Sequence, residues 1–179
     1  MRQLNNSDVE IQDRELVITR IFDAPKELVF KVWTEPEHIK NWWGPGPFTA
    51  PRCEVDLKVG GEYIYVMRSP DGQEFPVQGT FKEIVKNEKL VYTDDMFKQA
   101  DMWKMMIGGK VGPDVDFQTI QLNITVKFED VGSRSTRLTL TSRFVSNDVR
   151  DAMVGMMMAE GWTSSLQKFA DELARIYKN

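Results

Sequence analysis

The sequence predicts an α+β domain in which an antiparallel sheet of seven strands wraps around one long C-terminal helix. From Asn147 to Tyr177, apolar residues recur at alternating steps of three and four, which places them on one face of a helix. Between Arg52 and Phe144, several runs alternate apolar with polar residues, and short turns separate most of them. Such a sheet buries one face, and only the terminal helix is long enough to cover it.

The terminal helix is predicted as one continuous element. Asn147 or Asp148 can act as its N-cap, and Asp151 adds negative charge near the first turn, where the helix dipole favours it. At a rise of about 1.5 Å per residue, this helix is expected to be roughly 45 Å long. A bent sheet around such a helix leaves a cavity unless large side chains fill the space. The apolar face of the helix consists of Val149, Met153, Met156, Ala159, Trp162, Leu166, Phe169, Leu173 and Ile176.

The other elements follow in a simple order. Residues 1–14 are polar and are expected to form a loose extension ahead of a single domain at 15–179. The run from Glu15 to Phe22 is rich in β-branched residues and predicts the first strand. Two short helices follow, with Pro25 at the first helical position of one and Pro36 opening the other. Six further strands are predicted at 52–59, 62–68, 74–85, 90–93, 117–128 and 134–144.

Composition limits the classes of function. The chain has 179 residues, a net charge of -4 and no basic run, so nucleic acid is not an expected partner. A single cysteine, Cys53, excludes an internal disulfide and suits a reducing compartment. No apolar window reaches the length of a membrane span, and the N-terminal residues carry no apolar targeting segment. A cytoplasmic location is therefore predicted.

Eight short segments, taken in order, carry a family resemblance from about residue 15 to 177. They are Arg20 to Pro25, Val29 to Thr34, Trp42 to Pro45, Asp56 to Gly61, Pro70 to Gly72, Gly79 to Ile84, Glu88 to Thr93, and Gly161-Trp162. In sequence and spacing they resemble the AHSA-like proteins, homologues of the activator of the heat-shock-protein-90 ATPase, in the START/SRPBCC superfamily. The resemblance implies the Bet v 1-like helix-grip fold, with seven antiparallel strands gripping the C-terminal helix around an apolar cavity. It implies no reaction, because the family has no shared catalytic motif.

The segment 96–116 departs from this pattern because it is longer and more apolar than a plain loop. Met102, Trp103 and Met106 lie in it, followed by the flexible pair Gly108-Gly109. Methionine suits a surface that must accommodate varied apolar shapes. The segment is interpreted either as a lid over the cavity or as a surface that packs on the sheet or on a second subunit, which would make a homodimer.

Strand parity and the apolar helix face give a set of candidate cavity residues for a small apolar ligand. No catalytic residue, metal ligand or cofactor is predicted. The candidate ligand-binding residues are Trp43, Phe48, Tyr65, Met67, Phe81, Met102, Met106, Leu122, Ile124, Met153, Met157, Trp162 and Leu166.

Some motifs have two interpretations. The pair Trp42-Trp43 forms either an aromatic wall at the cavity mouth or an anchor for the short helices, and the anchor is favoured. His38 is the only histidine, and without a serine motif or metal-ligand spacing it is interpreted as a surface residue. Cys53 is interpreted as inert. Acidic residues could pair for acid–base chemistry, although the sequence does not show which of them converge: Glu54, Glu62, Asp94 and Asp95.

Three functions remain open at this point. The favoured one is the binding of a small hydrophobic or aromatic molecule in the cavity, without chemistry. The second is a protein-partner role, as an ATPase activator-like or stress-response protein, which the family name suggests. The third is a cyclase- or aromatase-type enzyme, as found elsewhere in the superfamily, and it requires an acid or base in the cavity. Enzymatic activity is left open, and a non-catalytic role is favoured.

Overall fold

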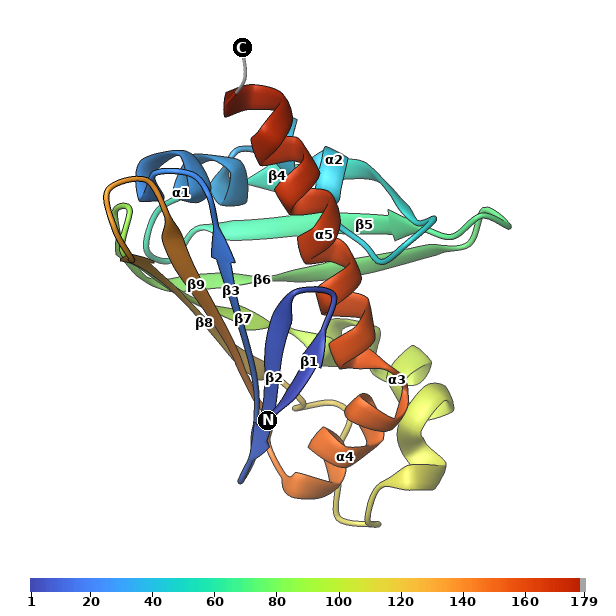
Figure 1. The fold of residues 1–179 in the computed structure, drawn as a ribbon. Helices are drawn as coiled ribbons and strands as arrows, with labels where there is room; N and C mark the ends of the chain where they lie inside the picture. The colour runs from blue at the N-terminus through green and yellow to red at the C-terminus, as the bar shows by residue number, and fades with distance from the viewer. Residues whose placement is uncertain (178–179) are drawn as a thin grey trace.

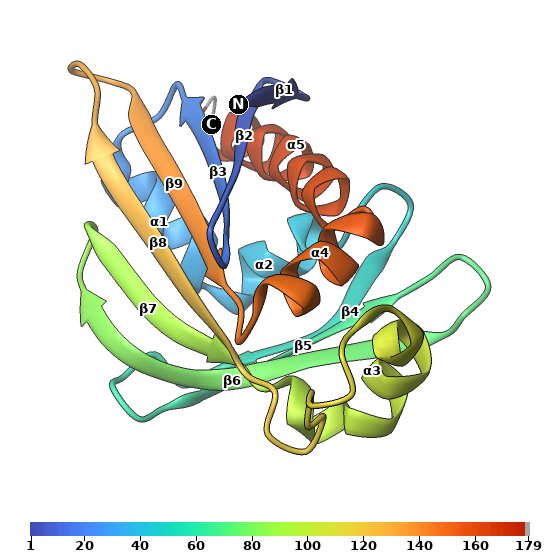
Figure 2. The ribbon, with the colours of Figure 1, turned by 90° about the horizontal axis from the view of Figure 1, so that it is seen from below.

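A nine-stranded antiparallel sheet curls around helix α5 in the computed structural model, which describes residues 1–177 (Figures 1 and 2). The strands lie in the order β1-β2-β3-β9-β8-β7-β6-β5-β4. The strands are β1 (Arg2–Leu4), β2 (Ser7–Gln12), β3 (Glu15–Phe22), β4 (Thr49–Val55), β5 (Glu62–Arg68), β6 (Glu74–Val85), β7 (Lys89–Asp94), β8 (Leu122–Asp130) and β9 (Thr136–Arg143). The helices are α1 (Lys26–Thr34), α2 (Pro36–Trp42), α3 (Ala100–Ile107), α4 (Asn147–Gly155) and α5 (Met158–Tyr177), with 3₁₀ turns η1 (Met96–Gln99) and η2 (Gly108–Lys110).

The α+β class and the gripped C-terminal helix are confirmed, but the prediction of seven strands is wrong. The two additional strands, β1 and β2, come from residues 1–14, which were expected to be loose. Strand β2 pairs with β3 from Asp8 opposite Thr19 to Gln12 opposite Glu15. Asn5 and Asn6 both have positive φ, which is the backbone of a tight hairpin turn between β1 and β2. Few inward-facing positions are apolar in so short a hairpin, so hydrophobic alternation did not show it.

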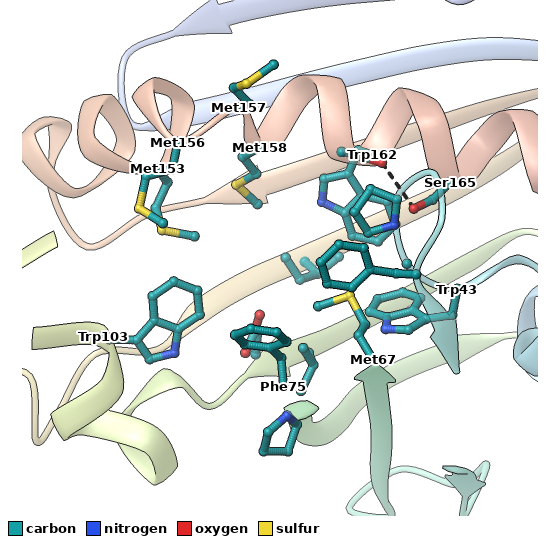
Figure 3. A pocket seen from close by; sticks show the side chains of 18 of the residues that line it. Trp43, Met67, Phe75, Trp103, Met153, Met156, Met157, Met158, Trp162 and Ser165 are labelled. Atoms are coloured by element: carbon teal, nitrogen blue, oxygen red, sulfur yellow. Dashed lines mark hydrogen bonds between the residues drawn. The ribbon is translucent and has the colours of Figure 1, made fainter. Parts of the chain in front are cut away.

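The predicted single terminal helix is two helices, α4 and α5. Met157 adopts a left-handed backbone with φ of 64°, which ends the first helix before the second begins (Figure 3). The N-cap is Ser146, whose Oγ accepts a hydrogen bond from the Val149 N–H at 3.2 Å, and not Asn147 or Asp148. The apolar spacing continues across the break, which is why periodicity alone predicted one helix.

Several further boundaries differ from the prediction; among them, β7 and β9 are shifted by one or two residues at each end. Pro25 is the N-cap of α1 and precedes the first helical residue. Strand β4 covers Thr49–Val55 rather than 52–59, because the chain turns before Gly60. Strand β8 starts at Leu122 rather than at Phe117, because Asp116 holds a turn there, accepting hydrogen bonds from the backbone N–H groups of Gln118 and Thr119.

The core lies between the concave face of the sheet and α5. Phe169 on α5 is fully buried, and its ring contacts Phe22 and Trp42 at centroid distances of 5.0 Å and Trp33 at 5.6 Å. Trp42 is also buried, and its Nε1 donates a hydrogen bond of 3.0 Å to the Val32 carbonyl. This aromatic cluster fixes α1 and α2 to the C-terminal half of α5 and leaves the other end of the groove to be covered by α3 and α4 (Figure 2).

A glycine allows the sheet to bend near that open end. A Cβ atom on Gly79 of β6 would lie 1.8 Å from the Thr93 carbonyl oxygen of β7, so only glycine fits. The same carbonyl accepts a hydrogen bond of 2.7 Å from the hydroxyl of Tyr63 on β5. These contacts hold β5, β6 and the end of β7 close together. Asp94 follows Thr93 directly and lies at the edge of the open end of the groove.

The helix break gives a first prediction. Replacing Met157 by glycine is expected to stabilise the ligand-free protein by about 0.5–1 kcal/mol, since a left-handed backbone costs an L-residue about 1–2 kcal/mol and glycine recovers part of it. The Met157 side chain is 63% exposed, so little packing is lost. Urea unfolding would measure the change. The control is Met156→Gly, where φ is -91° and the substitution should destabilise; equal effects at both positions would contradict the prediction.

Candidate functional site

A cavity of about 340 Å³ lies between the sheet, α3 and the α4–α5 junction (Figure 3). Strands β5 to β8 form its floor, and α4 and α5 lie across from them (Figure 3). Aromatic rings supply much of the wall: Trp43, Phe48, Tyr63, Phe75, Tyr92, Trp103 and Trp162. Seven of the ten methionines of the chain border the same space: Met67, Met102, Met106, Met153, Met156, Met157 and Met158. A volume in this range suits a small organic molecule.

The methionines surround the cavity from opposite sides. Met67 rises from β5, whereas Met153 of α4, Met156 of the junction and Met158 of α5 project toward it (Figure 3). Met157 differs from the others, because its side chain points outward from the helix junction and is largely exposed (Figure 3). Unbranched thioether side chains adapt to irregular apolar shapes. The wall can therefore fit ligands of different outline without a change of the sheet.

The aromatic side of the cavity is anchored in the core. Trp43 and Trp162 meet edge to face at a centroid distance of 5.2 Å, and Trp162 stacks on Trp33 at 6.2 Å. The pair Trp42-Trp43 was interpreted either as a wall of the cavity or as an anchor for the short helices, and each interpretation holds for one of the two residues. Trp42 anchors the short helices in the core, and Trp43 borders the cavity.

One carboxylate reaches the cavity. Asp94, the last residue of β7, borders it, and burial raises the pKa of this carboxyl group to about 7, with a further increase from the Asp95 carboxylate. Within residues 1–177, no hydrogen bond to the Asp94 side chain offsets this increase. Asp95 differs, since it accepts a hydrogen bond of 2.7 Å from Gln121 Nε2 and lies 3.4 Å from Lys98 Nζ. Asp94 and the Nε1 of Trp43, which is buried without a partner among residues 1–177, are thus the polar groups of the wall that remain for a bound molecule.

The structure brings most of the thirteen candidate residues together. Four of them do not border the cavity but lie in the core around it: Tyr65, Phe81, Leu122 and Leu166. Tyr65 is on the predicted face of β5, but Trp43 packs on it at 4.8 Å and separates it from the cavity. The nine that border the cavity are Trp43, Phe48, Met67, Met102, Met106, Ile124, Met153, Met157 and Trp162.

Sequence reasoning missed some cavity residues. The sequence analysis considers Asp94 only as one of four acidic residues that could pair, although period two places it on the same face as Leu90 and Tyr92. The sequence analysis places Trp103 in the segment 96–116 but not among the cavity residues, although it forms part of the cavity wall (Figure 3). Phe75 lies at the start of β6, on the same face as Val77. Alternation along the strands could have identified Asp94 and Phe75 as inward-facing, but nothing in the sequence determines which face of α3 is turned toward the cavity.

The interpretation of His38 as a surface residue is wrong. The residue is 8% exposed, and its Nδ1 lies 2.9 Å from Glu172 Oε1 on α5. The Arg175 guanidinium, followed by hydrogen bonds from His38 and Asn41, lowers the pKa of Glu172 to about 2. This network joins α2 to α5. The thiol of Cys53 is partly buried, and burial raises its pKa to about 11, which agrees with an unreactive side chain.

Comparisons with known proteins agree with this arrangement. A protein of Nitrosomonas europaea has a crystal structure that superposes with a TM-score of 0.76 at 25% identity, covering 95% of this chain and 100% of the other. The AHSA1 protein of Silicibacter pomeroyi gives 0.64 at 25% identity, with 89% and 97% covered. A solution structure from Arthrobacter aurescens gives 0.75 at 23% identity, with 94% and 91% covered, and shows the shared fold. No curated protein matches the chain.

The curled sheet, the gripped helix and the apolar cavity define a protein of the SRPBCC class with a helix-grip fold. The family model described as "Activator of Hsp90 ATPase homolog 1-like protein" matches residues 23–174. The chain therefore belongs to this family. In residues 1–177, none of the helices is both long enough and apolar enough to cross a membrane.

Proposed function

We propose that the protein binds a small, mainly apolar molecule in the cavity and needs no cofactor to do so. The observation that carries this proposal is the cavity itself, about 340 Å³ and lined mainly by tryptophan, phenylalanine and methionine side chains. Burial of apolar ligand surface contributes about 25 cal/mol per Å². The fold class commonly binds hydrophobic ligands, and this chain has the cavity that such binding requires.

Asp94 sets the polarity of the proposed ligand. Its carboxyl group is the acidic group in a mainly apolar wall, and it has no hydrogen-bonding partner among residues 1–177. Asp94 is half-buried, and a polar group without a partner in an apolar wall is unfavourable, so a ligand that supplies a partner gains affinity and orientation. We therefore propose a ligand with an apolar body and one polar group, such as an amine or hydroxyl, that meets Asp94.

A second function follows from the same residue. A carboxyl group with a pKa near 7 can both donate and accept a proton at neutral pH, which is what a general acid or base requires. A cyclase- or aromatase-type reaction on a bound aromatic or polyketone-like molecule would use Asp94 in that role. The sequence had offered no convincing acid for this alternative, and the structure supplies a candidate.

Native mass spectrometry of the freshly purified protein, followed by a denatured spectrum, tests the binding proposal. A small molecule that is present in the native spectrum and lost on denaturation would support binding and reveal the chemical class. Turnover of that molecule would favour the enzyme. An empty protein that also fails to bind a panel of apolar amines, alcohols and aromatics would contradict the proposal and move the protein-partner role to first place.

A cavity-filling variant provides a direct prediction. Val77→Phe on β6 places a larger side chain at the cavity wall and should weaken binding of a neutral fluorescent probe, N-phenyl-1-naphthylamine, by about tenfold or more, equal to about 1.4 kcal/mol. The matched control is Val85→Phe on the same strand, where Val85 is 38% exposed and outside the cavity. If both variants bind the probe with equal affinity, the probe binds outside the cavity and the prediction is contradicted.

The segment 96–116 forms part of the cavity wall through α3, and we propose that it moves to admit the ligand. Met102, Trp103 and Met106 of α3 border the cavity, whereas Met105 is 81% exposed on the opposite side. Limited proteolysis should cut this segment more slowly when the cavity is filled by the probe, because α3 then packs on a ligand. Cleavage at the same rate with and without the probe would contradict the role of a lid.

A further inference from the structure

A cluster of charged side chains lies at the junction of α1 and α2, outside the cavity wall. Glu35 is the C-cap of α1 and the N-cap of α2, and Pro36 fixes the chain directly after it. One side-chain ligand atom each from Glu35, Glu37 and His38 lies within 4.8 Å of the others. The short turn between the helices thus gathers three potential metal ligands from four consecutive positions.

The histidine in this cluster is held in one orientation. His38 Nδ1 lies 2.9 Å from Glu172 Oε1, and this oxygen also accepts hydrogen bonds from Asn41 and Arg175, so Nδ1 is a donor to it. Asn41 and Arg175 donate to the same carboxylate at 3.0 Å and 2.6 Å and fix its position. A carboxylate that receives the proton of one imidazole nitrogen leaves the other nitrogen oriented for a metal.

The second imidazole nitrogen has no hydrogen-bonding partner. His38 is 8% exposed, and its Nε2 is buried without a partner among residues 1–177. It lies 3.7 Å from Glu35 Oε2 and 3.5 Å from Glu37 Oε1. Both distances are longer than a hydrogen bond of about 2.7–3.2 Å. They are close to the roughly 3.3 Å that separates two ligands of one tetrahedral ion with bonds of about 2.0–2.1 Å.

We propose that Glu35, Glu37 and His38 bind one Zn²⁺ ion, with Glu172 as the positioning residue for the imidazole. Two carboxylates and one neutral imidazole match the charge and ligand types that Zn²⁺ accepts, and the exposed side of Glu37 leaves room for a water as fourth ligand. Lys31 Nζ lies 3.8 Å from Glu35 Oε2 and has to move aside when the ion binds. This site differs from the sequence-based expectation of no metal, and it does not depend on ligand binding in the cavity.

Because the chain contains one histidine, a nuclear magnetic resonance experiment can test the site directly. In a long-range proton–nitrogen spectrum of the metal-free protein, a single imidazole should appear with the proton on Nδ1. Addition of one equivalent of ZnCl₂ should shift the Nε2 resonance strongly and leave Nδ1 protonated. A spectrum that does not respond to Zn²⁺, or an imidazole that stays protonated on both nitrogens, would overturn the proposal.

Variants then assign the other ligands. Glu37 is 68% exposed at its side chain, so Glu37→Gln should fold normally and bind Zn²⁺ at least about tenfold more weakly by calorimetry. The matched control is Glu27→Gln, an exposed acid on α1 away from the cluster, which should leave the affinity unchanged. If Glu37→Gln binds Zn²⁺ as tightly as the natural protein, the ion lies elsewhere and the proposal fails.

Discussion

Replacing Asp94 by asparagine is expected to stabilise the ligand-free protein at pH 8 by about 2–4 kcal/mol. The folded protein holds this carboxyl group with a pKa of about 7, well above the ordinary value of about 3.9 for aspartate. The raised pKa means that folding favours the protonated form. The contribution of Asp94 to stability is therefore fully present below about pH 4 and is lost as the pH rises through 7. Asparagine is neutral at every pH and avoids this loss.

The pH dependence distinguishes this cause from a change in packing. Denaturant unfolding of both proteins between pH 4 and pH 8 should give a difference that grows over this window and levels off above pH 7. Asp95→Asn is the control, because Asp95 is already paired with Gln121 and Lys98 and its replacement should destabilise the protein. A difference between the Asp94 variant and the natural protein that is independent of pH would contradict the assignment. A polar group in the cavity that destabilises the empty protein is typical of a functional site.

The largest loss of stability is expected for Phe169→Ala, about 3–5 kcal/mol. The ring is fully buried and contacts Phe22, Trp33 and Trp42, so removing it leaves a void where α1, α2 and α5 meet the sheet. Large aromatic neighbours cannot collapse into such a void without leaving their preferred geometry. Urea unfolding followed by tryptophan fluorescence would measure the loss.

A matched truncation at the surface checks the size of this effect. Tyr177 lies on the same helix and is 45% exposed, so Tyr177→Ala should change the free energy of unfolding by no more than about 0.5 kcal/mol. A loss below about 1 kcal/mol for Phe169→Ala would mean that the aromatic cluster does not hold the helices in place. The central position of α5 in the fold would then need another cause.

The sequence was sufficient for the sheet wherever hydrophobic alternation is strong. Strands β3, β5 and β6 begin and end at the predicted residues, since each run is bounded by turn residues. The hairpin of β1 and β2 was not predicted, because it presents little apolar surface and depends on pairing with β3. The break at Met157 was not predicted either, because a left-handed methionine leaves no compositional mark, unlike glycine.

Part of the cavity wall could also be predicted from the alternation of apolar and polar residues. Parity along the strands and the helix face placed Met67, Ile124, Met153 and Trp162 correctly on the inner side. Parity shows which side chains face inward, but not whether an inward side chain borders the cavity or is packed in the core behind it. Core residues such as Leu166 were therefore assigned to the cavity. The burial of His38 also depends on a contact with α5, 134 residues further along the chain, which no local pattern reports.

The two edges of the sheet determine how this protein meets other copies of itself. Strand β1 has only three residues, and β4 carries Pro51, a register shift between Thr49 and Arg52, and the exposed ion pair of Arg52 with Glu54. A proline without an N–H and an irregular, charged strand are poor templates for a further strand. We therefore expect the protein to resist edge-to-edge aggregation at high concentration, and any association between copies to use side-chain surfaces rather than an extended sheet.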